Sequence, residues 1–182
     1  MKQRLILLAL AFILLPGCGR KLDAETAALA DSSAAVCLVR VEDAWEMVSA
    51  SGQRVRRLKC LVRTDFLGNL GDLSTRWLTP YIPERPYLYV LADAEWYTEQ
   101  CVPVKRAHEP IDLLLFLNPS EEDTTLRLRG GELREYPVFL PNGEEGLRLE
   151  PRDAAGLRLL KALRAYGETH SREPLGDGIV WD

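Results

Sequence analysis

Four cysteines and two histidines are the residues of this 182-residue chain best suited to nucleophilic or metal chemistry. Neither His108 nor His170 stands at metal-ligand spacing to another histidine or cysteine, and two histidines cannot form a three-histidine site. The sequence contains no nucleophile elbow, no zinc-protease helix motif and no phosphate-binding glycine loop. We therefore expect a protein that is not an enzyme and that holds no metal or cofactor.

The first cysteine, Cys18, ends a segment with the pattern of an export signal. Met1–Arg4 carries two basic residues, and Leu5–Leu15 is an unbroken apolar run, shorter than the roughly 20 residues that a membrane-spanning helix needs. Residues 15–18, Leu-Pro-Gly-Cys, resemble the lipobox of bacterial lipoproteins, which implies that residues 1–17 are removed and that the Cys18 thiol is lipidated. Ordinary secretory cleavage after Ala30 is the competing interpretation.

A lipid on Cys18 would tether the mature chain to a membrane, since several acyl chains hold a protein almost permanently. In lipoproteins the inner-membrane retention signal is typically an aspartate after the cysteine, and this chain has Gly19, so we expect the periplasmic face of the outer membrane. The mature chain would hold 21 Lys and Arg against 27 Asp and Glu, a formal charge of −6. Such an anionic surface makes nucleic acid an unsuitable partner.

Residues 18–34 are small and polar and are predicted to be a flexible tether, with a short helix over Ala24–Ala30 as the alternative. The folded domain is predicted to span residues 35–182. Its strongest signal is alternation of apolar and polar residues around Cys37 and again around Cys60, with a turn composition between them at Ser49–Gln53. This pattern predicts a β-hairpin.

Further short segments have strand-like composition, and turn residues separate them. The expected strands are Arg76–Thr79, Pro86–Ala92, Cys101–Lys105, Ile111–Leu117 and Thr124–Arg129, followed by a hairpin of Tyr136–Leu140 with Leu147–Leu149. A helix is predicted from Pro151 to a stop at Gly167, with one apolar face and with Arg158, Lys161 and Arg164 opposite it. The fold class is therefore predicted to be mainly β: an antiparallel β-sandwich with a C-terminal amphipathic helix.

Residues 36–130 also resemble the telokin-like, immunoglobulin-like sandwich domains of many secreted bacterial lipoproteins. The residues that carry the resemblance are the strand Lys59–Asp65 with Asn69 after it, the strand Tyr87–Ala94, and Ile111–Pro119 followed by residues 125–128. The resemblance implies an immunoglobulin-like sandwich and no particular activity.

Cys37, Cys60 and Cys101 remain after the lipidated cysteine, so one intramolecular disulfide is possible in an oxidising compartment. A turn near Ser51 would place Cys37 opposite Phe66 and would separate Cys37 from Cys60 by about 20 Å. We therefore expect Cys101 to pair with one of the other two, preferably Cys60. The remaining cysteine would be buried or available to another chain.

Six of the fourteen aromatic residues of the chain fall within residues 77–97. Three of them, Tyr81, Tyr87 and Trp96, are candidates for a partner or ligand surface, although aromatic residues also fill sandwich cores. Three basic residues of one predicted strand, Arg57, Lys59 and Arg63, share its outer face; they would keep that face soluble or meet an anionic envelope component.

Together these features predict a non-catalytic lipoprotein of the outer membrane that binds or helps to assemble another envelope protein. Capture of a small ligand or glycan by the aromatic segment 77–97 is the alternative from another class. A third possibility is an envelope hydrolase whose acidic residues come from separate strands.

Overall fold

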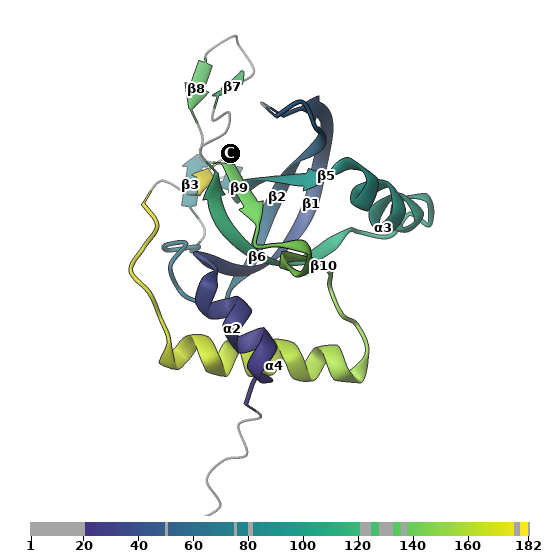
Figure 1. Cartoon of the computed structure of the whole chain (residues 1–182). Coiled ribbons are helices and arrows are strands. Elements are labelled where there is room, and N and C mark those ends of the chain that lie inside the picture. Colours follow the sequence, from purple (N-terminus) through teal and green to yellow (C-terminus); the bar gives the residue numbers. More distant parts are fainter. Residues whose placement is uncertain are drawn as a thin grey trace, which may run out of the picture.

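The computed structural model describes residues 21–49, 51–74, 76–79, 82–120, 125–127, 133–135, 138–176 and 179–181. Its centre is a closed barrel of five strands (Figure 1): β1 (Ala35–Val48), β2 (Arg54–Asp65), β5 (Pro86–Asp93), β6 (Asp112–Ser120) and β9 (Val138–Pro141). Neighbouring strands follow the order β1-β2-β5-β9-β6, and β6 pairs with β1 to close the ring. The prediction of an immunoglobulin-like sandwich, and with it the fold implied by the telokin-like resemblance, is therefore wrong.

The pairing of β1 with β2 explains why the barrel closes. Strand β1 is 14 residues long, and its register against β2 shifts between Leu38 and Val39 and again between Val41 and Asp43. Such bulges bend a strand and increase its twist. The first part of β1 can therefore turn away from the plane of β2 and pair with β6 over Ala35–Arg40. Apolar and polar residues alternate with period two in the strands of both barrels and sandwiches, so the sequence pattern does not distinguish these two folds.

The connectivity resembles that of an OB barrel, a five-stranded Greek-key barrel. Strands β5 and β9 are parallel and all other barrel neighbours are antiparallel, and the helix α3 (Ala94–Arg106) lies between β5 and β6. This likeness concerns architecture alone, because a fold of this kind serves many functions.

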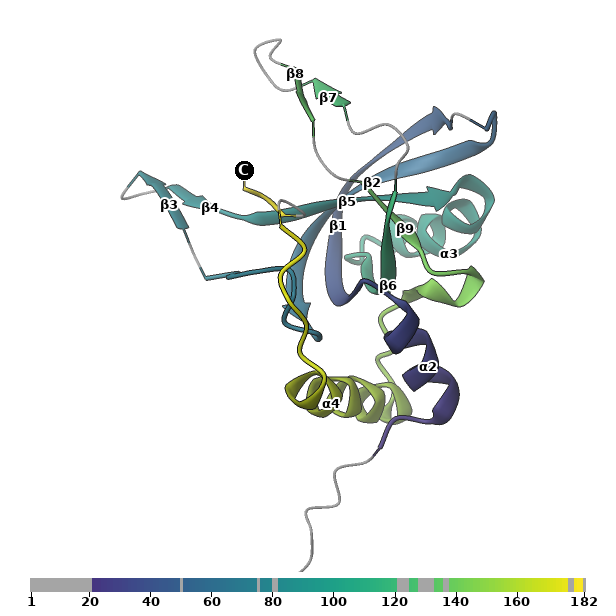
Figure 2. The ribbon, with the colours of Figure 1, turned by 60° about the vertical axis from the view of Figure 1, so that its left-hand side comes forward.

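Alternate residues of the strands fill the barrel interior, including Leu58, Leu88, Leu113 and Leu115. The residues between them on β1 and β6 form a second core on the outer wall, where α2 (Ala24–Ser32) and α4 (Ala154–Thr169) cover them (Figure 2). The run Leu113–Leu117 is fully buried because β6 has apolar packing on both faces. A continuous apolar run is the expected signature of such a strand.

The alternative prediction of a short helix before residue 35 is confirmed by α2. Asp23 caps its first turn, its side chain accepting a hydrogen bond from the Thr26 N–H at 2.8 Å. Arg172 donates to carbonyl oxygens at the other end of α2, those of Ala30 (2.9 Å) and Asp31 (3.0 Å). The part of residues 18–34 predicted as tether therefore includes a helix that packs on the barrel.

The amphipathic helix is confirmed as α4, and Asp153 caps it through the Gly156 N–H. Its predicted stop at Gly167 is wrong, since the helix continues to Thr169. Gly167 instead lies where α4 touches the backbone at Phe66: a Cβ added there would lie 1.5 Å from the Phe66 carbonyl oxygen. The glycine permits close packing rather than ending the helix.

One predicted strand and one predicted strand pairing are wrong. Cys101–Lys105 belongs to α3, which starts at the N-cap Asp93. Leu147–Leu149 is strand β10, as predicted, but it does not pair with β9; both strands pair with β6, at different residues. The 3₁₀ turn η1 (Glu144–Gly146) separates them.

The remaining strands lie outside the closed ring. They are β3 (Arg76–Thr79) paired with β4 (Ile82–Glu84), β7 (Thr125–Arg127) paired with β8 (Leu133–Glu135), and β11 (Val180–Trp181) paired with β5. The predicted strands at 76–79 and 86–92 are confirmed, as is the described part of 124–129.

Candidate functional site

The free end of the β1–β2 hairpin projects from the barrel (Figure 1). We call residues 43–49 and 51–59 the hairpin end. Strand β6 pairs with β1 only as far as Arg40, so that, of the described strands, β2 alone pairs with Asp43–Val48. The predicted turn closes the hairpin, the Ser49 N–H donating to the Gln53 carbonyl oxygen at 2.8 Å. One edge of β1 is therefore open over its second half.

The direction of the backbone groups along this edge follows from the turn. Because Ser49 bonds to β2, the alternating pattern of an antiparallel pair also directs Asp43, Trp45 and Met47 toward β2. Residues 44, 46 and 48 then turn their N–H and C=O groups to the open edge. The Ala44 N–H donates to its neighbour's carboxylate, Asp43 Oδ1, at 2.8 Å, which agrees with this direction.

Two apolar side chains of the hairpin end are exposed, Trp45 (42 %) and Val48 (63 %). Charged side chains lie beside them. Glu46 pairs with Arg54 and, at 2.8 Å, with Arg56. The hydrogen bond and charge of Arg54, with the charge of Arg56, lower the pKa of Glu46 from its ordinary value. The hairpin end thus combines apolar contact area with ionised groups, as partner surfaces do.

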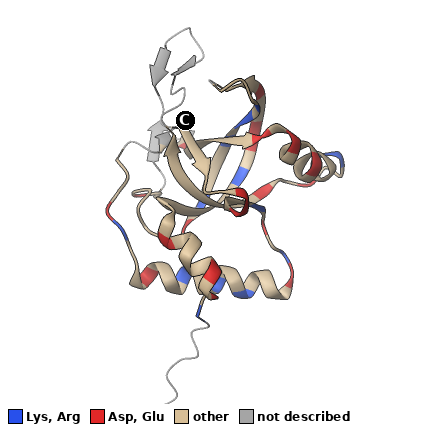
Figure 3. Ribbon diagram, viewed as in Figure 1, with Lys and Arg blue, Asp and Glu red and all other residues tan. Residues whose placement is uncertain are grey.

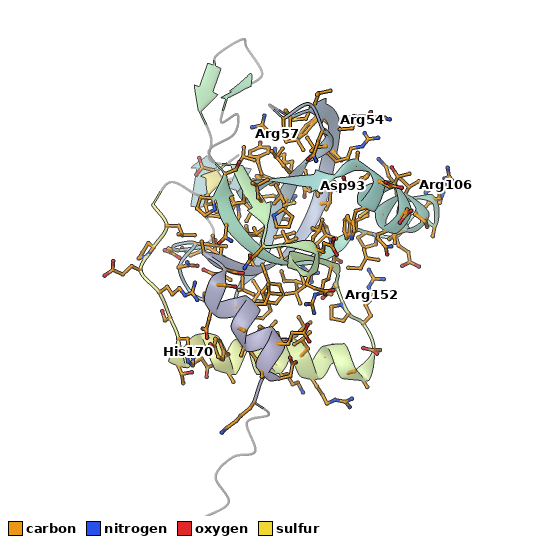
Figure 4. All side chains as sticks on the ribbon, in the orientation of Figure 1. Arg54, Arg57, Asp93, Arg106, Arg152 and His170 are labelled. Atoms are coloured by element: carbon orange, nitrogen blue, oxygen red, sulfur yellow. The ribbon has the colours of Figure 1, made fainter. Side chains whose placement is uncertain are left out.

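A groove of about 650 Å³ separates the hairpin end from the first turns of α3. Arg54 and Asp93 lie on its two sides (Figure 4). Glu95, Thr98 and Glu99 line the α3 side, where Figure 3 shows acidic residues. A smaller cavity of about 130 Å³ continues along the edge of β1, between residues 41–44 and the end of α3.

The basic outer face predicted for β2 is confirmed, because Leu58 and Cys60 point into the barrel. On the outside, the Arg57 guanidinium lies 5.4 Å from the centre of the Tyr89 ring, and the Lys59 ammonium lies 4.0 Å from that of Tyr87. These are cation–π distances. The face is not open, since Tyr87, Tyr89 and Arg57 are each 5–6 % exposed.

The predicted aromatic surface is divided among several environments. Tyr87 belongs to the packed cluster on β5 and donates its hydroxyl to Glu42 at 2.8 Å; burial, then Glu42, raises the pKa of Tyr87 to about 12. Trp96 lies in α3 and packs, half-buried, against the barrel core. Tyr81 lies outside the described residues. The structure therefore brings none of these three rings together as one open surface.

The three remaining cysteines all point into the barrel core and are free thiols in this structure. The register places Cys37 opposite Asp65 and Cys60 opposite Val41, closer together along the hairpin than predicted. Burial raises the pKa of all three thiols, that of Cys101 to about 12. The predicted Cys60–Cys101 disulfide remains a prediction.

A second charged cluster lies around Asp112, which is buried at the start of β6. Its carboxylate accepts two hydrogen bonds from Arg40, at 2.8 and 3.1 Å, and Arg63 lies 3.3 Å away. Burial acts to raise the pKa of Asp112, but the hydrogen bonds and charges of these arginines outweigh it and hold the pKa below its ordinary value. This cluster joins β1, β2 and β6 and is part of the scaffold.

Each histidine follows the end of a helix. His170 ends α4 and stacks on Tyr166 with ring centres 3.8 Å apart, and His108 lies exposed in the turn after α3. Within the described part of the chain, no three His, Cys, Asp or Glu side chains are grouped as metal ligands would be.

Cys18, the predicted site of lipidation, precedes the described residues. Among the helices that the structure describes, none is long and apolar enough to cross a membrane. Comparison with protein-family models, curated proteins and solved structures finds no match to this chain.

Signals for the hairpin end were partly present in the sequence. The turn at Ser49–Gln53 was recognisable, and Trp45 interrupts an otherwise polar stretch of β1. The β1–β6 pairing ends at Arg40, and this end depends on how the barrel closes. The alternation of apolar and polar residues along the strands does not reveal the closure.

Proposed function

We propose that this chain is a non-catalytic lipoprotein, anchored through Cys18 to the periplasmic face of the outer membrane, whose barrel binds another envelope protein. The anchor rests on the lipobox resemblance of residues 15–18. The binding role rests chiefly on the hairpin end, where Trp45 and Val48 are exposed beside an open strand edge and a groove of about 650 Å³. Exposed apolar residues with a charged rim are typical of contact surfaces.

We place the contact surface at the hairpin end and not at the aromatic segment 77–97. Tyr87 is buried, and Trp96 is occupied in packing α3 against the barrel. The likeness to OB barrels supports the same choice by fold analogy, because the loop between the first two strands contributes to ligand binding in those proteins.

The anchor is tested by mass spectrometry of the protein extracted from membranes. We expect an N-terminal peptide beginning at Cys18 and carrying three acyl chains, and a Cys18→Ser variant that is neither acylated nor cleaved there. An unmodified N-terminus at Asp31 would contradict the anchor and support ordinary secretion.

The binding role is tested by native gel electrophoresis of the lipoprotein solubilised in mild detergent. We expect a complex larger than the monomeric lipoprotein in its micelle. Trp45→Ala should abolish it, whereas Leu157→Ala, which removes an exposed apolar side chain of α4, should preserve it. Migration of the wild-type protein as a monomer, or equal loss in both variants, would contradict the proposal.

A further inference from the structure

We infer that the open edge of β1, residues 42–48, binds an extended, basic segment of the partner protein as an added β-strand. This inference deepens the proposed function and rests on it. Strand addition requires unpaired backbone donors and acceptors and exposed side chains on both faces of the edge. The charge of those side chains then decides which kind of segment binds.

The backbone requirement is met by the alternation described above. Glu46 and Val48 direct their N–H and C=O groups away from β2, and no described strand pairs with them on that side. The edge is accessible, since five of its residues are exposed: Glu42, Asp43, Trp45, Glu46 and Val48. An added strand would extend the barrel sheet by one ladder.

Both faces of the edge offer contacts to side chains of such a strand. Trp45 and Met47 lie on the outer face, where Met47 packs against the Tyr87 and Tyr89 cluster. On the opposite face Glu46 lines the groove of about 650 Å³. Side chains of an added strand would therefore alternate between an apolar ridge and a charged groove.

Charge selects the occupant. The edge carries three carboxylates, those of Glu42, Asp43 and Glu46. Arginines of the same protein lie at two of them, Arg85 at Glu42 and Arg54 and Arg56 at Glu46, so an added basic strand would share these carboxylates with them. On the facing surface of α3 and the segment after it, four acidic residues, Asp93, Glu95, Glu99 and Glu109, outnumber the one basic residue, Lys105. Pairing with a second copy of β1 would bring two sets of these carboxylates into one short ladder, where like charges destabilise cross-strand pairs. A segment with Lys or Arg in alternate positions would instead be attracted.

Edge protection is the simpler role of these charges, because natural proteins place charged residues and bulges on exposed strands. Protection accounts for the carboxylates and for the bulge between Val41 and Asp43. It does not account for Trp45 and Val48, whose exposure makes the edge more adhesive. Carboxylates beside exposed apolar residues block self-pairing and leave the edge open to a basic strand.

The test measures backbone hydrogen exchange of the full mature lipoprotein in detergent micelles. The probe is a capped peptide of about seven residues that alternates valine with lysine, the length of the open edge. We expect the proteolytic segment 42–49 to exchange at least about threefold more slowly with the peptide, and the segment of α4 to be unchanged. The same peptide with N-methyl groups on alternate residues, or with glutamate in place of lysine, should have no effect.

Protein variants test the charge argument in the same assay. In the Glu46→Lys variant, about tenfold more lysine peptide should be needed for the same protection. The matched change Glu168→Lys on exposed α4 should leave the required peptide concentration unchanged. Equal protection by the N-methylated peptide would overturn strand addition. Protection that appears without peptide at higher protein concentration would assign the edge to a second copy and overturn the inference.

Failure here and failure of the proposed function are distinguishable. A native complex that depends on Trp45, together with unchanged exchange of segment 42–49 in that complex, would refute strand addition while the binding role stands. If the wild-type protein forms no native complex, both the binding role and strand addition are refuted.

Discussion

The substitution Gly167→Ala tests the packing of α4 on the barrel, because the packing decides whether the free energy of unfolding rises or falls. In an isolated helix this change would stabilise by about 1 kcal/mol, because alanine has the higher helix propensity. In the structure the new Cβ would lie 1.5 Å from the Phe66 carbonyl oxygen, and real contacts of this kind are not closer than 3.0 Å. The helix would have to withdraw by at least about 1.5 Å, or Phe66 would have to move.

Withdrawal loosens the second core, where Leu163 of α4 packs with Phe66 and Leu67. Overpacking of this kind typically costs 1–3 kcal/mol and more when backbone must move, so we expect a net loss of about 2 kcal/mol after the propensity gain. For a domain of this size the loss corresponds to a fall in Tm of about 4–8 °C.

The assay is urea unfolding of the lipid-anchored protein in micelles, followed by circular dichroism. Ala165→Gly, at an exposed position of the same helix, is the matched control and should cost about 1 kcal/mol through propensity alone. A stabilised Gly167→Ala protein would refute the close approach of α4 to Phe66.

Three further predictions concern the scaffold. Asp112→Asn should lower the free energy of unfolding by about 2–3 kcal/mol at pH 7, because the carboxylate charge and one of its two hydrogen bonds from the charged Arg40 are lost. Since the pKa of Asp112 is depressed on folding, this difference should be present above the unfolded pKa of about 3.9 and vanish as pH falls through the folded pKa, which unfolding titrations at several pH values would show. Arg172→Met should cost about 1–2 kcal/mol and raise hydrogen exchange in α2, whose terminal carbonyls it leaves without this donor. Peptide mapping without reductant should join Cys60 to Cys101 in the exported protein; alkylation of both cysteines after unfolding would contradict the disulfide.

The local elements were largely predictable from the residues. The turn at Ser49–Gln53, the strand at 86–92 and the amphipathic helix each follow from composition and period, and each is present. The strand predicted at Cys101–Lys105 is wrong because the N-cap Asp93 starts a helix that runs through these residues to Arg106.

The global arrangement was not predictable in the same way. Closure depends on two register shifts in the β1–β2 pair, with one extra residue in β2 (Arg63) and one in β1 (Glu42), and on the pairing of Ala35–Arg40 with β6. Neither feature has a period that one sequence reveals. The sequence predicts a helix stop at Gly167 because glycine is common just after the last helical residue. Only the contact with Phe66 shows that its missing side chain serves tertiary packing.

The binding role of the hairpin end is tested most directly by photo-crosslinking in intact cells. A photoreactive amino acid would replace Val48 at the open edge and, in a separate strain, Leu157 on α4; both positions are exposed. We expect position 48 to give one specific adduct with an envelope protein that position 157 does not give, and we expect Trp45→Ala to abolish it. No adduct from position 48, or the same adducts from both positions, would contradict the assignment of the hairpin end as the partner surface.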